Sequence, residues 1–203
     1  NVVLVHTPDG NVIVDTGMSP SRAETIKKAL TEKAPNGRVR AIIYTHSHID
    51  HVGGASVWKE TDTRIWASKN FLENLFKQYA LFGPIETIRG KRQFGEDVSE
   101  KELPCSAIGR KADVQAALES GLRLPTDTFT GRQRLNIGGL EIELIEAHGE
   151  TSDQLFVWIP ADKTLLAADN FYRAFPNLYT IRGTEPRPVD DWIKALDAMR
   201  RKE

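Results

Sequence analysis

Three of the five histidines in this 203-residue chain fall within six positions, in the stretch Thr45-His46-Ser47-His48-Ile49-Asp50-His51-Val52-Gly53-Gly54. The apolar, β-branched run from Arg40 to Tyr44 precedes this cluster and is typical of a buried strand. Two glycines and a predicted helix start at 55–58 follow it. The cluster is therefore expected in a polar loop at the end of a strand.

Imidazole nitrogens and carboxylate oxygens together suit zinc or a similar transition metal. In an extended backbone, residues i and i+2 point the same way, so His46 and His48 can bind one ion. Asp50 and His51 are adjacent and project differently, so they can serve a second ion beside the first. The alternative is a polar loop that is rich in histidine by accident, and the density of the cluster favours metal binding.

Composition restricts the remaining classes of function. Hydrophobic residues make up 40% and charged residues 27% of the chain, as in soluble globular proteins. The net charge of −1 argues against non-specific binding to nucleic acids or anionic membranes. No apolar run reaches the roughly 18 residues of a membrane span. Cys105 is the single cysteine, so no disulfide can form within the chain.

Hydrophobic periodicity and turn residues predict a single domain in which strands and helices alternate. The strands are expected at 2–5, 12–14, 40–44, 63–67, 133–137, 140–145, 155–159 and 164–168, and helices at 20–33, 68–79 and from 189 onward. The signal is weak over 81–125, apart from a short helical window at 112–118. That segment is expected either to line the site or to elaborate the surface.

Two later strand ends carry further candidate ligands. His148 and Glu150 follow the predicted strand 140–145, and Asp169 follows the predicted strand 164–168. A carboxylate between two ions would suit Asp169. The alternatives are a turn or capping aspartate at 169 and a surface histidine at 148.

The histidine stretch, together with the upstream Asp15-Thr16-Gly17, resembles the signature of the metallo-β-lactamase superfamily. That resemblance implies an α/β (α+β) fold, a four-layer αββα sandwich with a dinuclear metal site along one edge of its two sheets. The superfamily hydrolyses many substrates, so the fold alone does not name the reaction.

The second half of the chain resembles one group within that superfamily, the type III alkyl sulfatases. The similar stretches are Gly149–Pro160, Leu165–Tyr172 and Phe175–Gly183. The resemblance implies that Glu150, rather than His148, is a ligand, because this group has glutamate where most of the superfamily has its third histidine. It also implies that Asp169 is shared between the metals, although glutamate is commoner there, and that Arg182 contacts sulfate.

The resemblance thus implies a hydrolase that cleaves alkyl sulfate esters to alcohol and sulfate with a metal-activated water. Its cofactor would be two Zn²⁺ ions, and its substrate a small anionic ester. Asp50 and Arg182 are the expected catalytic residues, and Asp15 would orient the histidines. The expected metal ligands are His46, His48, Asp50, His51, Glu150 and Asp169. Two alternatives remain: a hydrolase of another ester, thioester, lactone or β-lactam, and a metal-binding domain without turnover.

The sequence departs from this group in two respects. The group's second metal takes one more histidine downstream of the arginine, whereas none follows His148 here. The group also carries a helical dimerisation region and a C-terminal carrier-like domain, which do not fit before Glu203. We therefore expect residues 1–203 to be one catalytic domain of a longer, homodimeric protein that is periplasmic or secreted. The isolated chain would hold one metal well and the other poorly.

Overall fold

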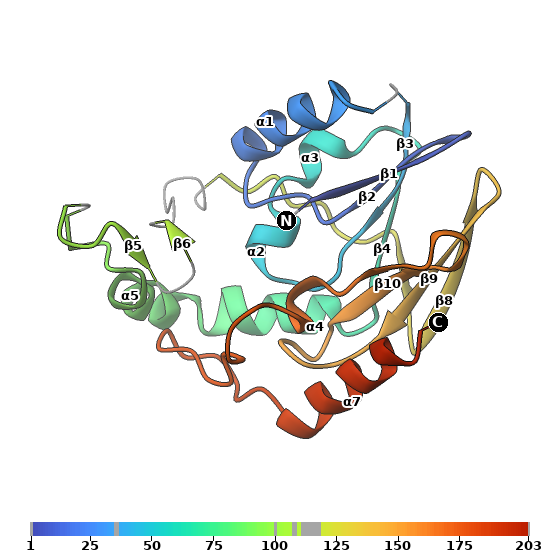
Figure 1. The fold of residues 1–203 in the computed structure, drawn as a ribbon. Helices are drawn as coiled ribbons and strands as arrows, with labels where there is room; N and C mark the ends of the chain where they lie inside the picture. The colour runs from blue at the N-terminus through green and yellow to red at the C-terminus, as the bar shows by residue number, and fades with distance from the viewer. Residues whose placement is uncertain (1, 35–36, 100, 107–108, 111–118, 203) are drawn as a thin grey trace.

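The computed structural model describes residues 2–34, 37–99, 101–106, 109–110 and 119–202. Two β-sheets pack face to face, and helices cover the outer faces of both (Figure 1). This arrangement is the predicted four-layer αββα sandwich. The helical window predicted at 112–118 lies outside the described residues.

The first sheet carries the histidine loop. Its strand order is β1-β2-β3-β4-β7, with β1 antiparallel to β2 and the other neighbours parallel. Parallel strands end at the same edge of a sheet, so the chain segments that follow β2, β3 and β4 meet there. The strands are β1 (Val3–Thr7), β2 (Gly10–Val14), β3 (Val39–Ile43), β4 (Arg64–Ser68) and β7 (Asp127–Phe129).

The second sheet is antiparallel throughout, in the order β11-β10-β9-β8. Glu150 lies in the connection between β9 and β10, and Asp169 follows β11 in a 3₁₀ turn, η3 (Ala168–Asn170). The strands are β8 (Arg132–Ile137), β9 (Leu140–Glu146), β10 (Leu155–Ile159) and β11 (Thr164–Leu166). A third, two-stranded sheet pairs β5 (Cys105–Ser106) with β6 (Gly109–Arg110).

Strand β10 shows how the layers are built. Its five residues are all buried and alternate between two cores. Leu155, Val157 and Ile159 belong to the core between the sheets. Phe156 and Trp158 face the other way and pack against helix α7 (Val189–Arg200). A strand buried on both faces reads as a continuous apolar run, which is why it was predictable from sequence.

Helices also cover the outer face of the first sheet, which points away from the second sheet. Helix α1 (Pro20–Thr31) begins at Ser19, whose hydroxyl accepts the N–H of Arg22, and it ends two residues before the predicted boundary. The short helices α2 (Ile49–Val52) and α3 (Ala55–Trp58) continue the histidine loop. Ala23, Val52 and Trp58 from these helices share a core with the outer face of the sheet. No helix among the described residues is both long and apolar enough to cross a membrane.

The segment after β4 is more helical than its sequence predicts. Helix α4 (Phe71–Phe76) passes into a π-helical turn, η1 (Lys77–Leu81), and then into α5 (Gly83–Phe94). Pro84 lies in the first turn of α5, where proline is tolerated, and Gly95 ends the helix with a φ of 63°. Glycine and proline are also common in loops, which weakens the helical signal of this segment in the sequence.

Candidate metal centre

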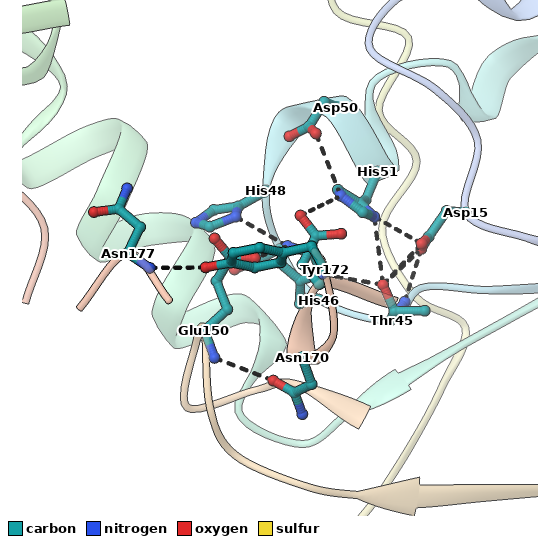
Figure 2. A network of polar contacts seen from close by, with 12 residues as sticks. Asp15, Thr45, His46, His48, Asp50, His51, Glu150, Asn170, Tyr172 and Asn177 are labelled. Atoms are coloured by element: carbon teal, nitrogen blue, oxygen red, sulfur yellow. Dashed lines mark hydrogen bonds and ion pairs between the residues drawn. The ribbon is translucent and has the colours of Figure 1, made fainter. Parts of the chain in front are cut away.

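The first cluster of candidate ligands joins the two sheets. His46 and His48 come from the loop after β3, and Glu150 comes from the loop between β9 and β10 (Figure 2). The Nε2 atom of His46 lies 2.9 Å from Nδ1 of His48 and 3.9 Å from Oε2 of Glu150. One ligand atom from each residue lies within 4.8 Å of the others. This spacing fits one metal ion with three protein ligands.

The second cluster centres on His51. Its Nε2 atom lies 3.3 Å from Oδ2 of Asp50 and 3.4 Å from Oδ2 of Asp169. His46, His51 and Asp169 also offer ligand atoms within 4.8 Å of one another, so the two clusters adjoin. Asp169 follows the last strand of the second sheet and reaches the histidine loop of the first.

Asp15 and Thr45 contact the rings of His51 and His46 on the side away from their Nε2 atoms (Figure 2). Oδ2 of Asp15 lies 2.7 Å from Nδ1 of His51, and its carboxylate also accepts the Thr45 hydroxyl at 2.8 Å. The same hydroxyl lies 3.0 Å from Nδ1 of His46. If both rings carry their proton on Nδ1, each Nε2 presents a lone pair toward the site. One carboxylate thereby orients His51 directly and His46 through Thr45.

Two carboxylates reach the site from strained backbone. Asp15 has a φ of 59° and Ala168, the residue before Asp169, has a φ of 49°. Both values lie in the left-handed region, which costs energy for residues other than glycine, although aspartate tolerates it better than most. Two such residues beside one histidine cluster indicate that the fold sacrifices local stability to position these groups.

The imidazoles have unusual electrostatics. Burial lowers the pKa of His46 well below its ordinary value, and it lowers the pKa of His48 to about 3, with Asp50 opposing and Arg182 adding to the shift. His51 behaves in the opposite way. Burial lowers its pKa, but the adjacent Asp15, Asp169 and Asp50 raise it well above the ordinary value. Among the protonation states of these rings, the charged imidazolium is therefore favoured at His51, and the neutral imidazole is favoured at His46 and His48.

The carboxylates complete a donor set suited to a divalent metal. Oε2 of Glu150 is buried and has no hydrogen-bond partner in the part of the chain that the structure describes. Burial raises the pKa of Glu150 to about 8, against the opposing charge of Arg187 and with a further increase from Asp169. An unpartnered buried carboxylate oxygen beside two imidazoles is what a metal ion would satisfy. The residues present therefore fit the metal that their pattern predicts.

The other predicted residues lie outside these two clusters. His148 belongs to neither group of possible ligands among the described residues. Arg182 is half-buried, and its backbone N–H donates to Oε1 of Gln93 on α5 at 2.8 Å. Its charge adds to the lowering of the pKa of His48 that burial produces, so the guanidinium lies near the first cluster. Cys105 is exposed and unpaired.

Arg187 and Asn170 have polar contacts to Glu150 and were not predicted. The side chain of Arg187 is 3% exposed, and its Nη1 lies 2.8 Å from Oε1 of Glu150. Asn170 accepts the Glu150 N–H at 3.2 Å and donates to the carbonyl of Ala147 at 2.6 Å, so it fixes the loop that carries Glu150. Neither contact leaves a local sequence pattern, because each joins residues at least 20 positions apart.

A pocket of about 90 Å³ opens beside the first cluster. His48, Glu150 and Arg187 line it, together with Lys77 of η1 and Phe82, the residue that follows η1. The helical segment 71–94, whose sequence signal was weak beyond Leu81, therefore contributes to the walls of the site.

An αββα sandwich with histidine and carboxylate clusters at one edge of its sheets defines the class of metallo-β-lactamase folds. The family model described as the metallo-beta-lactamase superfamily matches residues 1–203. The chain belongs to this superfamily.

Among characterised proteins, the chain is similar to alkylsulfatases. It is 31% identical to a linear primary-alkylsulfatase of a Pseudomonas species over 97% of its own length and 38% of that protein. It is 28% identical to an alkyl/aryl-sulfatase of Saccharomyces cerevisiae over 98% of its own length and 32% of that protein. The solved structure of the stereoselective inverting sec-alkylsulfatase Pisa1 from a Pseudomonas species is 26% identical, with a TM-score of 0.89 over 98% of this chain and 32% of that one.

These similarities confirm the resemblance to alkylsulfatases that the second half of the sequence indicates. The chain spans less than two-fifths of the length of the curated relatives named above. The activity and partners of the whole protein are therefore matters for proposal.

Proposed function

We propose that residues 1–203 form the catalytic core of a zinc-dependent hydrolase that cleaves alkyl sulfate esters to an alcohol and sulfate. The observation that carries the proposal is the carboxylate of Glu150 beside His46 and His48, in a chain that is similar to alkylsulfatases over nearly its whole length. A half-buried arginine near the same cluster supports an anionic substrate.

In this proposal, His46, His48 and Glu150 hold one zinc ion, and Asp50 and His51 hold a second. Asp169 offers a ligand atom close to both His51 and His46, and it is proposed as the carboxylate that both ions would share. When bound, zinc supplies a water molecule whose pKa is lowered toward neutrality.

Arg182 is proposed to bind the sulfate group of the ester. Its guanidinium offers donors in a planar fork that matches two sulfate oxygens, and its charge offsets the negative charge that develops as sulfate departs. Asp50 is proposed to orient the attacking water as well as to hold the metal, because its carboxylate is partly exposed beside His51.

The test compares substrates on the zinc-loaded protein. Sulfate release from dodecyl sulfate is measured beside hydrolysis of a carboxylic ester, a thioester, a lactone and a β-lactam. Turnover that prefers dodecyl sulfate supports the proposal. A preference for any uncharged ester or lactam would assign the chain to another hydrolase of the superfamily. Tight zinc binding without turnover on any member of the panel would favour a non-catalytic metal-binding domain.

A further inference from the structure

A buried positive charge accompanies the one carboxylate in the first cluster. The side chains of Arg187 and Glu150 are 3% and 10% exposed, and Nη1 lies 2.8 Å from Oε1. The contact is an ion pair rather than an aligned hydrogen bond. A buried carboxylate or guanidinium without a partner is strongly unfavourable, so each of these charges needs the other.

The two carboxylate oxygens of Glu150 have different neighbours. Oε1 faces Arg187, whereas Oε2 faces His46 Nε2 at 3.9 Å and lacks a hydrogen-bond partner among the described residues. With Oε1 held by the guanidinium, Oε2 is the oxygen that remains for a metal ion. Arg187 therefore also determines which way the carboxylate is turned.

The backbone around Arg187 restricts its movement. Pro186 and Pro188 flank it, and proline fixes its own φ and limits the conformation of the residue before it. The N–H of Arg187 donates to the carbonyl of Leu178 at 2.9 Å, and the carbonyl of Pro188 accepts the N–H of Trp192 in α7. The guanidinium is thus presented from a segment anchored to the helix that covers the second sheet.

We propose that Arg187 is a positioning residue for the first metal ion, and that Glu150 and Arg187 act as a matched pair. A neutral ligand at position 150 would need no cation beside it, whereas a buried glutamate does. The inference rests on the proposed metal site, but it concerns binding of the ion and not the substrate.

The test is a cycle of four proteins: the parent, Arg187→Met, Glu150→His and the double variant. Zn²⁺ alone is titrated in competition with a chromophoric chelator, and thermal melting and circular dichroism report folding. Arg187→Met should weaken the tighter zinc-binding step about 10- to 100-fold, which is typical of lost outer-shell contacts. Glu150→His leaves Arg187 buried without a counter-charge and should also weaken binding. The double variant should bind zinc more tightly than either single variant, because a neutral ligand then has no unpaired charge beside it.

Arg64→Met is the matched control, since Arg64 is an exposed arginine paired with Asp127 at the opposite end of β4. It should bind zinc as the parent does. Parent-like zinc affinity in Arg187→Met would overturn the proposal, as would losses that simply add in the double variant. If Arg187→Met fails to fold and the double variant folds, the recovery supports the pairing; if both fail, the pairing is rejected. Because the readout is zinc binding, an intact pairing without dodecyl sulfate hydrolysis would refute only the proposed function.

Discussion

Asp15→Asn is the most informative single change in the network beneath the histidines. The Asp15 carboxylate is nearly inaccessible and serves two residues: it accepts the N–H and hydroxyl of Thr45, and it accepts Nδ1–H of His51 at 2.7 Å. Asparagine keeps the shape and tolerates the φ of 59° at least as well. It has only one acceptor oxygen, however. If that oxygen stays with Thr45, the NH₂ group of the new asparagine faces Nδ1 of His51.

The expected loss follows from the tautomer of His51. Facing an NH₂ group, Nδ1 must accept, so the ring proton moves to Nε2, the atom that faces Asp50 and Asp169. A hydrogen bond to a charged group contributes about 1.5–3 kcal/mol. Replacing an outer-shell partner of a metal-binding histidine costs about 10- to 100-fold in metal affinity, which is about 1.4–2.7 kcal/mol. The two estimates agree, so we expect Asp15→Asn to weaken zinc binding at His51 by that factor.

Competition titration with Zn²⁺ measures the effect, and thermal melting of the metal-free protein separates it from general instability. The control is Asp62→Asn, because Asp62 is 68% exposed and pairs only with Arg38 among the described residues. Its zinc affinity should equal that of the parent. If Asp15→Asn binds zinc with parent affinity while remaining folded, the carboxylate does not set the ring orientation, and this reasoning fails.

Three further predictions concern the substrate, the core and pH. Arg182→Met should lower kcat/KM for dodecyl sulfate about 10- to 150-fold while zinc content is unchanged, since it removes charged hydrogen bonds worth about 1.5–3 kcal/mol; unchanged kinetics would exclude Arg182 from substrate binding. Phe156→Ala should reduce the free energy of unfolding by about 3–5 kcal/mol in denaturant titrations, because Phe156 is fully buried against α7, whereas Phe175→Ala, at an 84% exposed position, should change it by less than about 0.5 kcal/mol; equal losses would contradict the assigned core. Burial raises the pKa of Asp153 to about 7, so the folded protein keeps this proton after the unfolded chain has released it, and the contribution of Asp153 to stability falls as pH rises from about 4 to 7. Asp153→Asn removes that loss. The melting temperatures of the metal-free variant and the metal-free parent should therefore diverge, with the variant gaining relative to the parent between pH 5 and pH 8. A difference that does not change with pH would refute the pKa shift of Asp153.

Much of the fold follows from short-range patterns. The five apolar residues of β10 fixed both its bounds and its position between two layers, and Ser19-Pro20 marked the start of α1. Helix α5 was missed because Gly83-Pro84 also suits a loop, and because much of the helix is exposed, so its apolar periodicity is weak. Where tertiary packing selects between two local readings, the local pattern alone does not decide.

The candidate site likewise contains residues that local sequence patterns predict and a residue that they do not. His46, His48, His51 and the strand-end carboxylates could be singled out because each stands at the end of a predicted strand, and strand ends converge. Arg187 could not, although the need for it was implicit in Glu150: a buried carboxylate ligand requires a counter-charge. The chain offers 27 lysines and arginines, and nothing local distinguishes the one that packs 37 residues away. The physical requirement was therefore predictable from one residue, whereas the residue that meets it depends on how α7 and the loop before it are packed.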